Sequence, residues 1–220
     1  MEHRNNTREH RDIWQNIWLH KNRLSYFVDY GRFVYNGFFR KMLRKHINGQ
    51  TEFLELGCGT STLTISLAKE MKGLVGLDIS PEALKISQDC AKKYGVTNAK
   101  FIDGNCLDVP FQGTFDIVWS QGLMEHFDNP LLVAEQHWKA TKLGGTTLIS
   151  VPYKWSYLTP WYTITRPKIF RSLWPWTDQT FFSKKELIKI GKKITPSARV
   201  YLLRPFFLGI VILELKKPIS

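Results

Sequence analysis

The 220-residue sequence is poor in cysteine, has no long apolar run and carries fewer acidic than basic residues. Its three cysteines, Cys58, Cys90 and Cys106, show no paired spacing, which favours a reduced, cytoplasmic protein over a disulfide-bonded secreted one. The most apolar stretch, 201–215, contains an Arg-Pro pair and is shorter than the ~20 residues that a spanning helix needs. Because the first residues are charged, we expect neither a signal peptide nor a transmembrane segment.

Acidic residues are scarce at both ends of the chain, so the formal net charge of +12 is unevenly distributed. Residues 1–50 carry a net charge of +6, residues 51–150 of −4, and residues 151–220 of +10. Basic flanks attract an anionic substrate, an anionic membrane surface or a nucleic acid, and they can also serve only to keep a protein soluble. No group of His, Cys and Asp residues has metal-ligand spacing, so we predict no metal site.

The sequence is organised around a glycine turn at residues 55–61. The turn follows an apolar run, 53–56, that predicts a buried strand, and it precedes residues 62–71, whose apolar side chains recur at helical spacing. Gly57 and Gly59 remove side chains that would keep a ligand from the backbone, so this strand–turn–helix junction predicts a nucleotide site.

A second expected strand, 74–77, ends in Asp78, whose carboxylate can accept both hydroxyls of a ribose. The G-x-G-x-x-G pattern of NAD-binding proteins is incomplete here, because Thr62 occupies its last position.

Strand and helix patterns alternate along the chain, which predicts βαβ units and a parallel sheet. Ser80, Asn129 and Ser183 are expected to cap the helices that follow them, and Asp12 an N-terminal helix. The expected helices span 12–22, 31–46, 62–71, 81–94, 130–141 and 184–194. The expected strands span 53–56, 74–77, 99–102, 114–119, 146–151, 200–203 and 206–215, with a glycine turn at 143–145.

Five motifs follow one another between residues 53 and 151: ELGCGTS, GLDIS, FIDGNCLDVPF, FDIVWSQGLMEHF and KLGGTTLIS. In this order they resemble class I S-adenosylmethionine (SAM)-dependent methyltransferases of the small-molecule type that includes quinone-biosynthesis enzymes. The resemblance implies a Rossmann-like α/β fold with a seven-stranded, mostly parallel sheet, helices on both faces and a C-terminal antiparallel strand pair. It also implies an N-terminal helical cover (1–50) on a SAM-binding domain (51–220) that carries a substrate lid (152–182).

The resemblance implies a SAM site beyond the carboxyl ends of the strands, where open α/β sheets bind ligands. The residues implied to bind SAM are Glu55, Gly57, Cys58, Gly59, Asp78, Ile79, Asn105, Cys106 and Gln121. Relatives commonly have Gly-Asp-Ala after the third strand. At the position of that Asp, the side-chain oxygen of Asn105 is expected to accept a hydrogen bond from the adenine amino group, and Asp103 is the alternative. The Cys106 N–H would face the adenine ring, and we interpret the Cys58 and Cys106 thiols as pocket walls.

Residues of the helical cover often meet the methionine carboxylate in such enzymes, and Tyr30, Arg32 and Tyr35 are candidates for this contact or for packing. His126, in a Glu-His pair, is the candidate general base, because an unperturbed histidine titrates near neutral pH; a structural role is the alternative. Asp116 is interpreted as structural.

Residues 152–182 are rich in aromatic side chains with basic residues between them. They are expected to line an acceptor pocket, to enter a membrane interface, or to form the core of an irregular insertion. The aromatic residues assigned to the lid are Tyr153, Trp155, Trp161 and Tyr162. Single-stranded nucleic acid is a minor alternative, because no RNA-binding motif is present.

The expected function is methyl transfer from SAM to a small-molecule or lipid-like acceptor, anionic or aromatic, by in-line displacement. The chain has no Asn/Asp-Pro-Pro-aromatic run and no Pro-Cys pair, which argues against nucleic-acid methylation. The alternatives are a SAM-binding module without catalysis and a peripheral protein attached to the inner membrane surface by its basic, aromatic lid.

Overall fold

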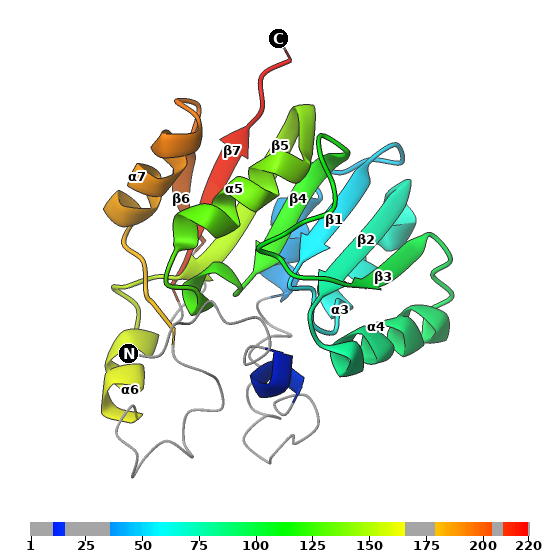
Figure 1. Ribbon diagram of the computed structural model, residues 1–220, viewed down its shortest axis with the longest axis horizontal. Coiled ribbons are helices and arrows are strands. Elements are labelled where there is room, and N and C mark those ends of the chain that lie inside the picture. The colour runs from blue at the N-terminus through cyan, green and yellow to red at the C-terminus, as the bar shows by residue number, and fades with distance from the viewer. Residues whose placement is uncertain (1–10, 16–35, 166–178, 204–208, 220) are drawn as a thin grey trace.

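The computed structural model describes residues 11–15, 36–165, 179–203 and 209–219 (Figure 1). Its centre is one seven-stranded sheet with the order β3-β2-β1-β4-β5-β7-β6. In chain order, the strands are β1 (Glu52–Leu56), β2 (Gly73–Asp78), β3 (Ala99–Asp103), β4 (Phe115–Gln121), β5 (Thr141–Pro152), β6 (Arg199–Leu203) and β7 (Ile210–Lys216). Strands β1 to β5 pair in parallel, whereas β7 is antiparallel to both β5 and β6. The expected mostly parallel sheet with a C-terminal antiparallel pair is confirmed.

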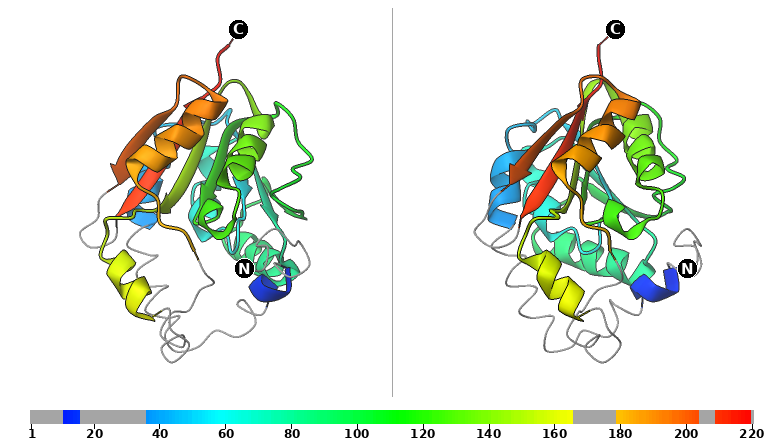
Figure 2. Two further views of the ribbon diagram at one scale, coloured as in Figure 1. Left: turned by 60° about the vertical axis from the view of Figure 1, so that its left-hand side comes forward. Right: turned by 90° about the vertical axis from the view of Figure 1, so that its left-hand side faces the viewer.

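Helices cover both faces of this sheet (Figure 2). The helices are α3 (Thr62–Ile65), η1 (Ala68–Glu70), α4 (Pro81–Lys93), η2 (Met124–His126), α5 (Pro130–Ala140), α6 (Leu158–Thr165) and α7 (Lys184–Ile194), and residues 11–15 and 36–43 are also helical. Helices α5 and α7 pack on one face, and α3, α4 and residues 36–43 pack on the other. No helix in these described segments is long and apolar enough to cross a membrane.

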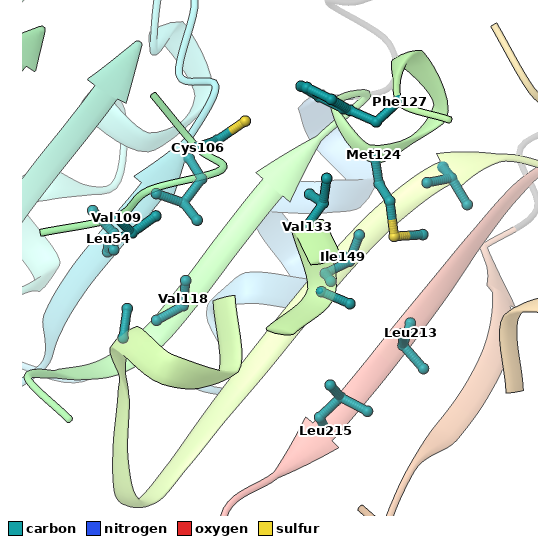
Figure 3. Close-up of a cluster of buried hydrophobic side chains, with 14 of the residues drawn as sticks. Leu54, Cys106, Val109, Val118, Met124, Phe127, Val133, Ile149, Leu213 and Leu215 are labelled. Carbon is teal, nitrogen blue, oxygen red and sulfur yellow. The ribbon is translucent and has the colours of Figure 1, made fainter. Parts of the chain in front are cut away.

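The alternation of side chains along the buried strands separates the core into two layers. Leu54 belongs to the layer that α5 and α7 cover, together with Val118, Ile149 and Leu213 (Figure 3). The intervening side chains face the other layer, where the Phe39 ring meets the Trp119 ring edge-on, with centroids 5.3 Å apart. Because both faces are buried, the strands read as nearly continuous apolar runs, as parallel strands do.

The helix caps predicted from the sequence are confirmed at three sites. The side chains of Ser80 and Asn129 accept hydrogen bonds from backbone N–H groups in the first turns of α4 and α5. Ser183 and Glu186 form the expected reciprocal capping box at the start of α7. At the N-terminus the expectation is wrong, because Asp12 lies within helical residues 11–15 and does not precede them.

The helix expected over residues 62–71 is also wrong, because it is interrupted. The α-helix ends after Ile65, and η1 follows with hydrogen bonds of the i to i−3 type. The Ser66 hydroxyl donates to the Leu63 carbonyl at 2.6 Å, and the Asn98 amide donates to the Ala68 and Met71 carbonyls. The Ser66 hydroxyl thus binds a carbonyl that a continuous helix would pair internally, and the Asn98 amide binds carbonyls of the last turn, which an α-helix leaves without an internal partner.

The glycine turn expected before the fifth strand is a bulge inside β5. Phe115 of β4 lies opposite Thr141, whereas Ile117 lies opposite Thr146. Three extra residues of β5 are therefore accommodated between these two pairs. A Cβ on Gly145 would lie 2.8 Å from the Asp116 carbonyl oxygen, which explains why the chain needs glycine there.

Candidate active site

The chain reverses the direction of its strand order between β1 and β4, and a cavity of about 970 Å³ lies at this place. Ligands in open α/β sheets bind at this switch point, beyond the carboxyl ends of the strands. All nine residues predicted to bind the cofactor line this one cavity: Glu55, Gly57, Cys58, Gly59, Asp78, Ile79, Asn105, Cys106 and Gln121. A volume near the upper end of the usual range for ligand pockets leaves room for two small molecules.

The turn after β1 brings the backbone close to its neighbours. Gly57, Gly59 and Ser61 all adopt positive φ angles, of 61°, 52° and 47°. A Cβ on Gly57 would lie 2.6 Å from Leu123 Cδ1, and the Cys58 N–H donates to the Leu77 carbonyl at 3.1 Å. Ser61 is the only non-glycine residue of the described chain with a positive φ, so it adopts a backbone conformation that favours glycine.

Asp78, at the end of β2, is held in place by backbone donors. Its Oδ2 accepts from the Gly59 N–H at 2.8 Å, and its Oδ1 accepts from the Ser80 N–H at 2.9 Å. Burial raises the pKa of this carboxyl above its ordinary value, and the backbone hydrogen bonds oppose the rise. A carboxylate fixed in this way keeps lone pairs available to accept the hydroxyls of a ligand.

Glu55 is the second buried acid of the cavity, with 4% of its surface exposed. Its Oε2 accepts from the hydroxyls of Ser61 at 2.9 Å and Thr64 at 2.5 Å. Burial raises the pKa of Glu55 to about 7, although these two hydroxyls oppose the rise. Ser61, the residue with the positive φ angle, therefore also anchors the Glu55 carboxyl through its side-chain hydroxyl.

The segment after β3 favours Asn105 over Asp103 as the polar residue of the cavity. Asp103 is not a lining residue; it forms an exposed ion pair with Arg11 at 2.6 Å. Asn105 Oδ1 accepts from the Leu107 N–H at 2.9 Å. Burial raises the pKa of the Cys106 thiol to about 12, consistent with a pocket wall and not with a nucleophile.

The loop after β4 carries the remaining side of the cavity. Gln121 and Leu123 line it together with Glu125 and His126 of η2, which are 3% and 6% exposed. The His126 ring packs edge-on against Trp14, with ring centroids 5.0 Å apart. Burial raises the pKa of Glu125 to about 8. His126 is the candidate base that its residue type suggested, whereas Glu125 beside it was not predicted to have a chemical role.

The described aromatic residues assigned to the lid do not reach the cavity wall. Trp155 is 75% exposed, whereas Tyr162 is buried and packs on Phe181, with centroids 5.3 Å apart. Tyr153 pairs with Phe182 in an isolated bridge. The segment instead contributes Pro152 and Gln179 to the cavity. The side chain of Trp161 lies outside the described part of the structure.

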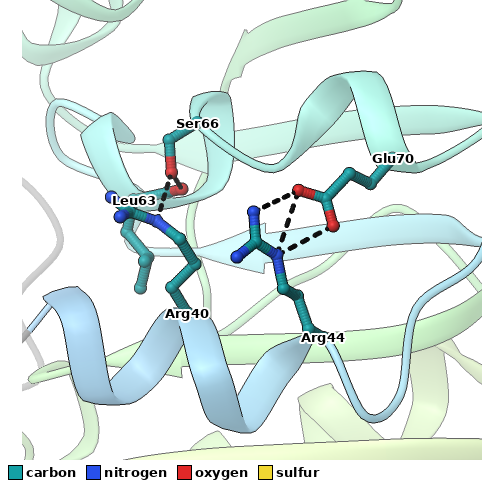
Figure 4. Close-up of polar contacts among 5 residues, drawn as sticks. All are labelled: Arg40, Arg44, Leu63, Ser66 and Glu70. Atoms are coloured by element: carbon teal, nitrogen blue, oxygen red, sulfur yellow. Dashed lines mark hydrogen bonds and ion pairs between the residues drawn. The ribbon is translucent and has the colours of Figure 1, made fainter.

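A basic margin on the N-terminal side was not predicted. Arg40 and Lys69 line the cavity, and Arg40 Nε donates to Ser66 Oγ at 3.2 Å (Figure 4). One turn further along, Arg44 forms a bidentate ion pair with Glu70. The four-residue spacing of Arg40 and Arg44, which places both on one helix face, was the feature of the sequence that could have predicted this basic margin. The earlier candidates Tyr30, Arg32 and Tyr35 lie outside the described residues.

Asp116 has the structural role expected of it. Its carboxylate accepts from the Glu52 N–H at 2.9 Å and pairs with Lys142, and so joins the starts of β1 and β5. In the described ranges no group of three or more His, Cys, Asp or Glu side chains is arranged to hold a metal ion.

The sequence of this chain is similar to a known protein family and to curated relatives. Residues 47–187 match the family described as "Methyltransferase domain". The demethylmenaquinone methyltransferase of Geobacillus stearothermophilus is 34% identical over 148 residues, which are 64% of this chain and 61% of that protein. The ubiquinone biosynthesis O-methyltransferase of Methylococcus capsulatus is 31% identical over 98 residues, 44% of this chain and 41% of that protein. The chain thus spans about three fifths or less of these two relatives.

A solved structure has the same fold over nearly the whole chain. The magnesium protoporphyrin IX methyltransferase of Synechocystis PCC 6803, determined with bound SAH, superposes with a TM-score of 0.75 at 18% identity. The superposition covers 96% of this chain and 100% of that one.

Proposed function

Because the chain belongs to the methyltransferase-domain family, we propose that it is a SAM-dependent methyltransferase acting on a small or lipid-like acceptor related to quinones. One observation carries the proposal: nine residues chosen from the sequence as SAM ligands line a single cavity at the switch point of the sheet. The names of the two curated relatives support the quinone type of acceptor.

The residues of the cavity fit SAM in shape and charge. Gly57 keeps the turn free of a side chain, and Asp78 is already oriented by two N–H groups toward accepting ribose hydroxyls. Glu55 adds a second acid, which suits a ligand that carries positive charge. Bound SAM would supply a methyl group on a positively charged sulfur; the acceptor's nucleophile would bond to the methyl carbon in line, and the sulfur would leave with the electron pair of the broken bond. The protein contributes alignment, which can lower a barrier by ~7–11 kcal/mol.

Paired substitutions at the ends of neighbouring strands test SAM binding. Asp78 of β2 and Asp103 of β3 lie opposite each other in the sheet, but only Asp78 lines the cavity. We expect Asp78→Asn to weaken the binding of SAH, the demethylated product, by roughly 10- to 150-fold, because a hydrogen bond to a charged group contributes ~1.5–3 kcal/mol. Asp103→Asn should leave the affinity unchanged. Calorimetry measures both, and equal affinities for the two variants would contradict the proposal.

A SAM-binding module without catalysis would give the same binding result but no methylated product from any acceptor.

Attachment to an anionic membrane surface is a separate proposal about location. It is supported by the side chains of Trp155, Tyr157 and Ile164, which are 75%, 69% and 63% exposed in the segment that follows β5. Trp and Tyr side chains are enriched at membrane–water interfaces, and basic residues such as Lys154 favour an anionic surface.

A further inference from the structure

The cavity has a second half that the residues proposed to bind SAM do not occupy. The ends of β1, β2 and β3 carry those residues, with Gln121 at the end of β4. On the other side of β4, the cavity is lined by Val151 and Pro152 of β5 and Ile210 of β7, with Phe127 after η2. The side chains of these four residues are apolar, the polar residues Ser150, His126 and Gln179 also line the cavity here, and Glu125 is the acidic side chain of this wall.

Glu125 is held against the end of β4 by its surroundings. Gly122 has a φ of 67°, and a Cβ at this position would lie 3.3 Å from Glu125 Oε1. The Thr180 N–H donates to the Glu125 carbonyl at 2.9 Å and fixes the backbone of η2 to the segment before α7. Within the described chain, Glu125 Oε2 is buried and has no hydrogen-bond partner. A buried oxygen without a partner is costly unless a ligand supplies a donor.

We propose that the Glu125 carboxylate accepts a hydrogen bond from a hydroxyl group of the acceptor and takes up its proton as the methyl group is transferred to that oxygen. This assignment rests on the methyltransferase function proposed above. It makes the acceptor a hydroxyl-bearing, largely apolar molecule, such as a catechol or a reduced quinone, because the surrounding wall offers mainly apolar contact and Glu125 is the carboxylate on this side of β4.

The charges around Glu125 are consistent with this role. Helix α5 and strand β5 pack against η2, and their ionisable side chains have other partners or are exposed. On α5, the His137 ring contacts the Val133 carbonyl, Lys139 donates to the Val109 carbonyl, and Glu135 is exposed. On β5, Lys142 forms an ion pair with Asp116. On η2 itself, His126 packs against Trp14.

Burial, without a neighbouring charge, accounts for the pKa of Glu125 near 8. At pH 7 about one tenth of the carboxyls are then ionised, and a base with this pKa is stronger than an exposed glutamate.

The transfer step is balanced without any further reactant. The acceptor oxygen forms the new bond to the methyl carbon with one of its lone pairs, and the electron pair of the broken carbon–sulfur bond stays on sulfur. The hydroxyl proton moves to the Glu125 carboxylate. The product is a neutral methyl ether, and the protonated Glu125 returns its proton to water after the product leaves.

The test compares the 220-residue chain with its Glu125→Gln, His126→Asn and Glu135→Gln variants, the last being an exposed control on α5. Methyl transfer to tert-butylcatechol and dihydroxynaphthalene is followed by mass spectrometry between pH 6 and 9.5. We expect kcat/KM of the wild type to rise with pH to an inflection near 8. Glu125→Gln should lower kcat by ~10²–10⁴-fold with little change in KM, and should remove the inflection. The Glu135→Gln control should behave as the wild type.

A spectroscopic arm makes the test independent of turnover. Infrared difference spectra should show a protonated carboxyl band that is lost in Glu125→Gln and that shifts when tert-butylcatechol, but not its dimethyl ether, is added to the SAH-loaded protein. If this band does not respond, or if His126→Asn alone removes the kinetic inflection, the assignment to Glu125 is overturned. Failure of the wild type to bind SAH would instead overturn the proposed function itself.

Discussion

The buried Glu55 carboxyl is expected to make the ligand-free protein less stable as the pH rises. Its pKa is about 7 in the folded chain against an ordinary value of 4.5, so between these pH values the folded state binds the extra proton. The free energy of unfolding therefore falls as the pH rises through this window, and the loss is complete above pH 7. A shift of this size corresponds to about 3 kcal/mol.

Glu55→Gln should remove this loss, because a glutamine oxygen can still accept from the Ser61 and Thr64 hydroxyls. We expect the variant to be more stable than the wild type by about 3 kcal/mol at pH 8 and equally stable near pH 4. Urea unfolding at a series of pH values measures the difference, with the exposed Glu135→Gln as control. Because Glu125 contributes a similar fall in both proteins, the difference between them isolates Glu55.

The same substitution should weaken ligand binding, since it removes a negative charge from the cavity. Saturating SAM should therefore stabilise the wild type more than Glu55→Gln at pH 8. Two results would refute the reasoning: an unfolding free energy that differs between the two proteins by the same amount at pH 4 and pH 8, or a Glu55→Gln variant that binds SAM as tightly as the wild type.

Two further predictions concern acid stability and location. Burial lowers the pKa of His137 to about 4, so the free energy of unfolding falls as the pH falls from 6.5 to 4. At pH 4.5 His137→Leu should therefore be more stable than the wild type by up to about 3 kcal/mol. A urea midpoint of the variant that is unchanged or lower at this pH would contradict the prediction. Vesicles of phosphatidylserine and phosphatidylcholine should sediment with the protein at low salt and release it at high salt, and the double substitution Trp155→Ser and Tyr157→Ser should reduce sedimentation; vesicles that bind both proteins equally would exclude this surface.

The fold could be predicted because its signals are local and repeated. The apolar strands, the Ser80-Pro81 and Asn129-Pro130 starts and the Ser183 capping box each determine their own segment, and the structure agrees with them. Apolar spacing also suggested one helix over 62–71, but this pattern cannot reveal that Asn98, almost thirty residues away, satisfies carbonyls at its broken end.

The candidate site divides in the same way. Motif positions identified the glycine turn, Asp78 and Asn105, all of which line the cavity. The sequence did not identify Glu125 as a chemical group, because its burial and its unpartnered oxygen result from packing by β5, α5 and the segment near Thr180. Composition also drew attention to Trp155, whose exposure depends on how the chain after β5 folds away from the cavity.

The central claim is that the cavity beside the glycine turn holds the methyl donor, and a crystal structure of the chain with SAH tests it most directly. We expect one SAH molecule beyond the carboxyl ends of β1, β2 and β4, with both ribose hydroxyls within hydrogen-bonding distance of Asp78. SAH bound at another place, or bound here with its ribose away from Asp78, would show that this cavity is not the methyl-donor site described above.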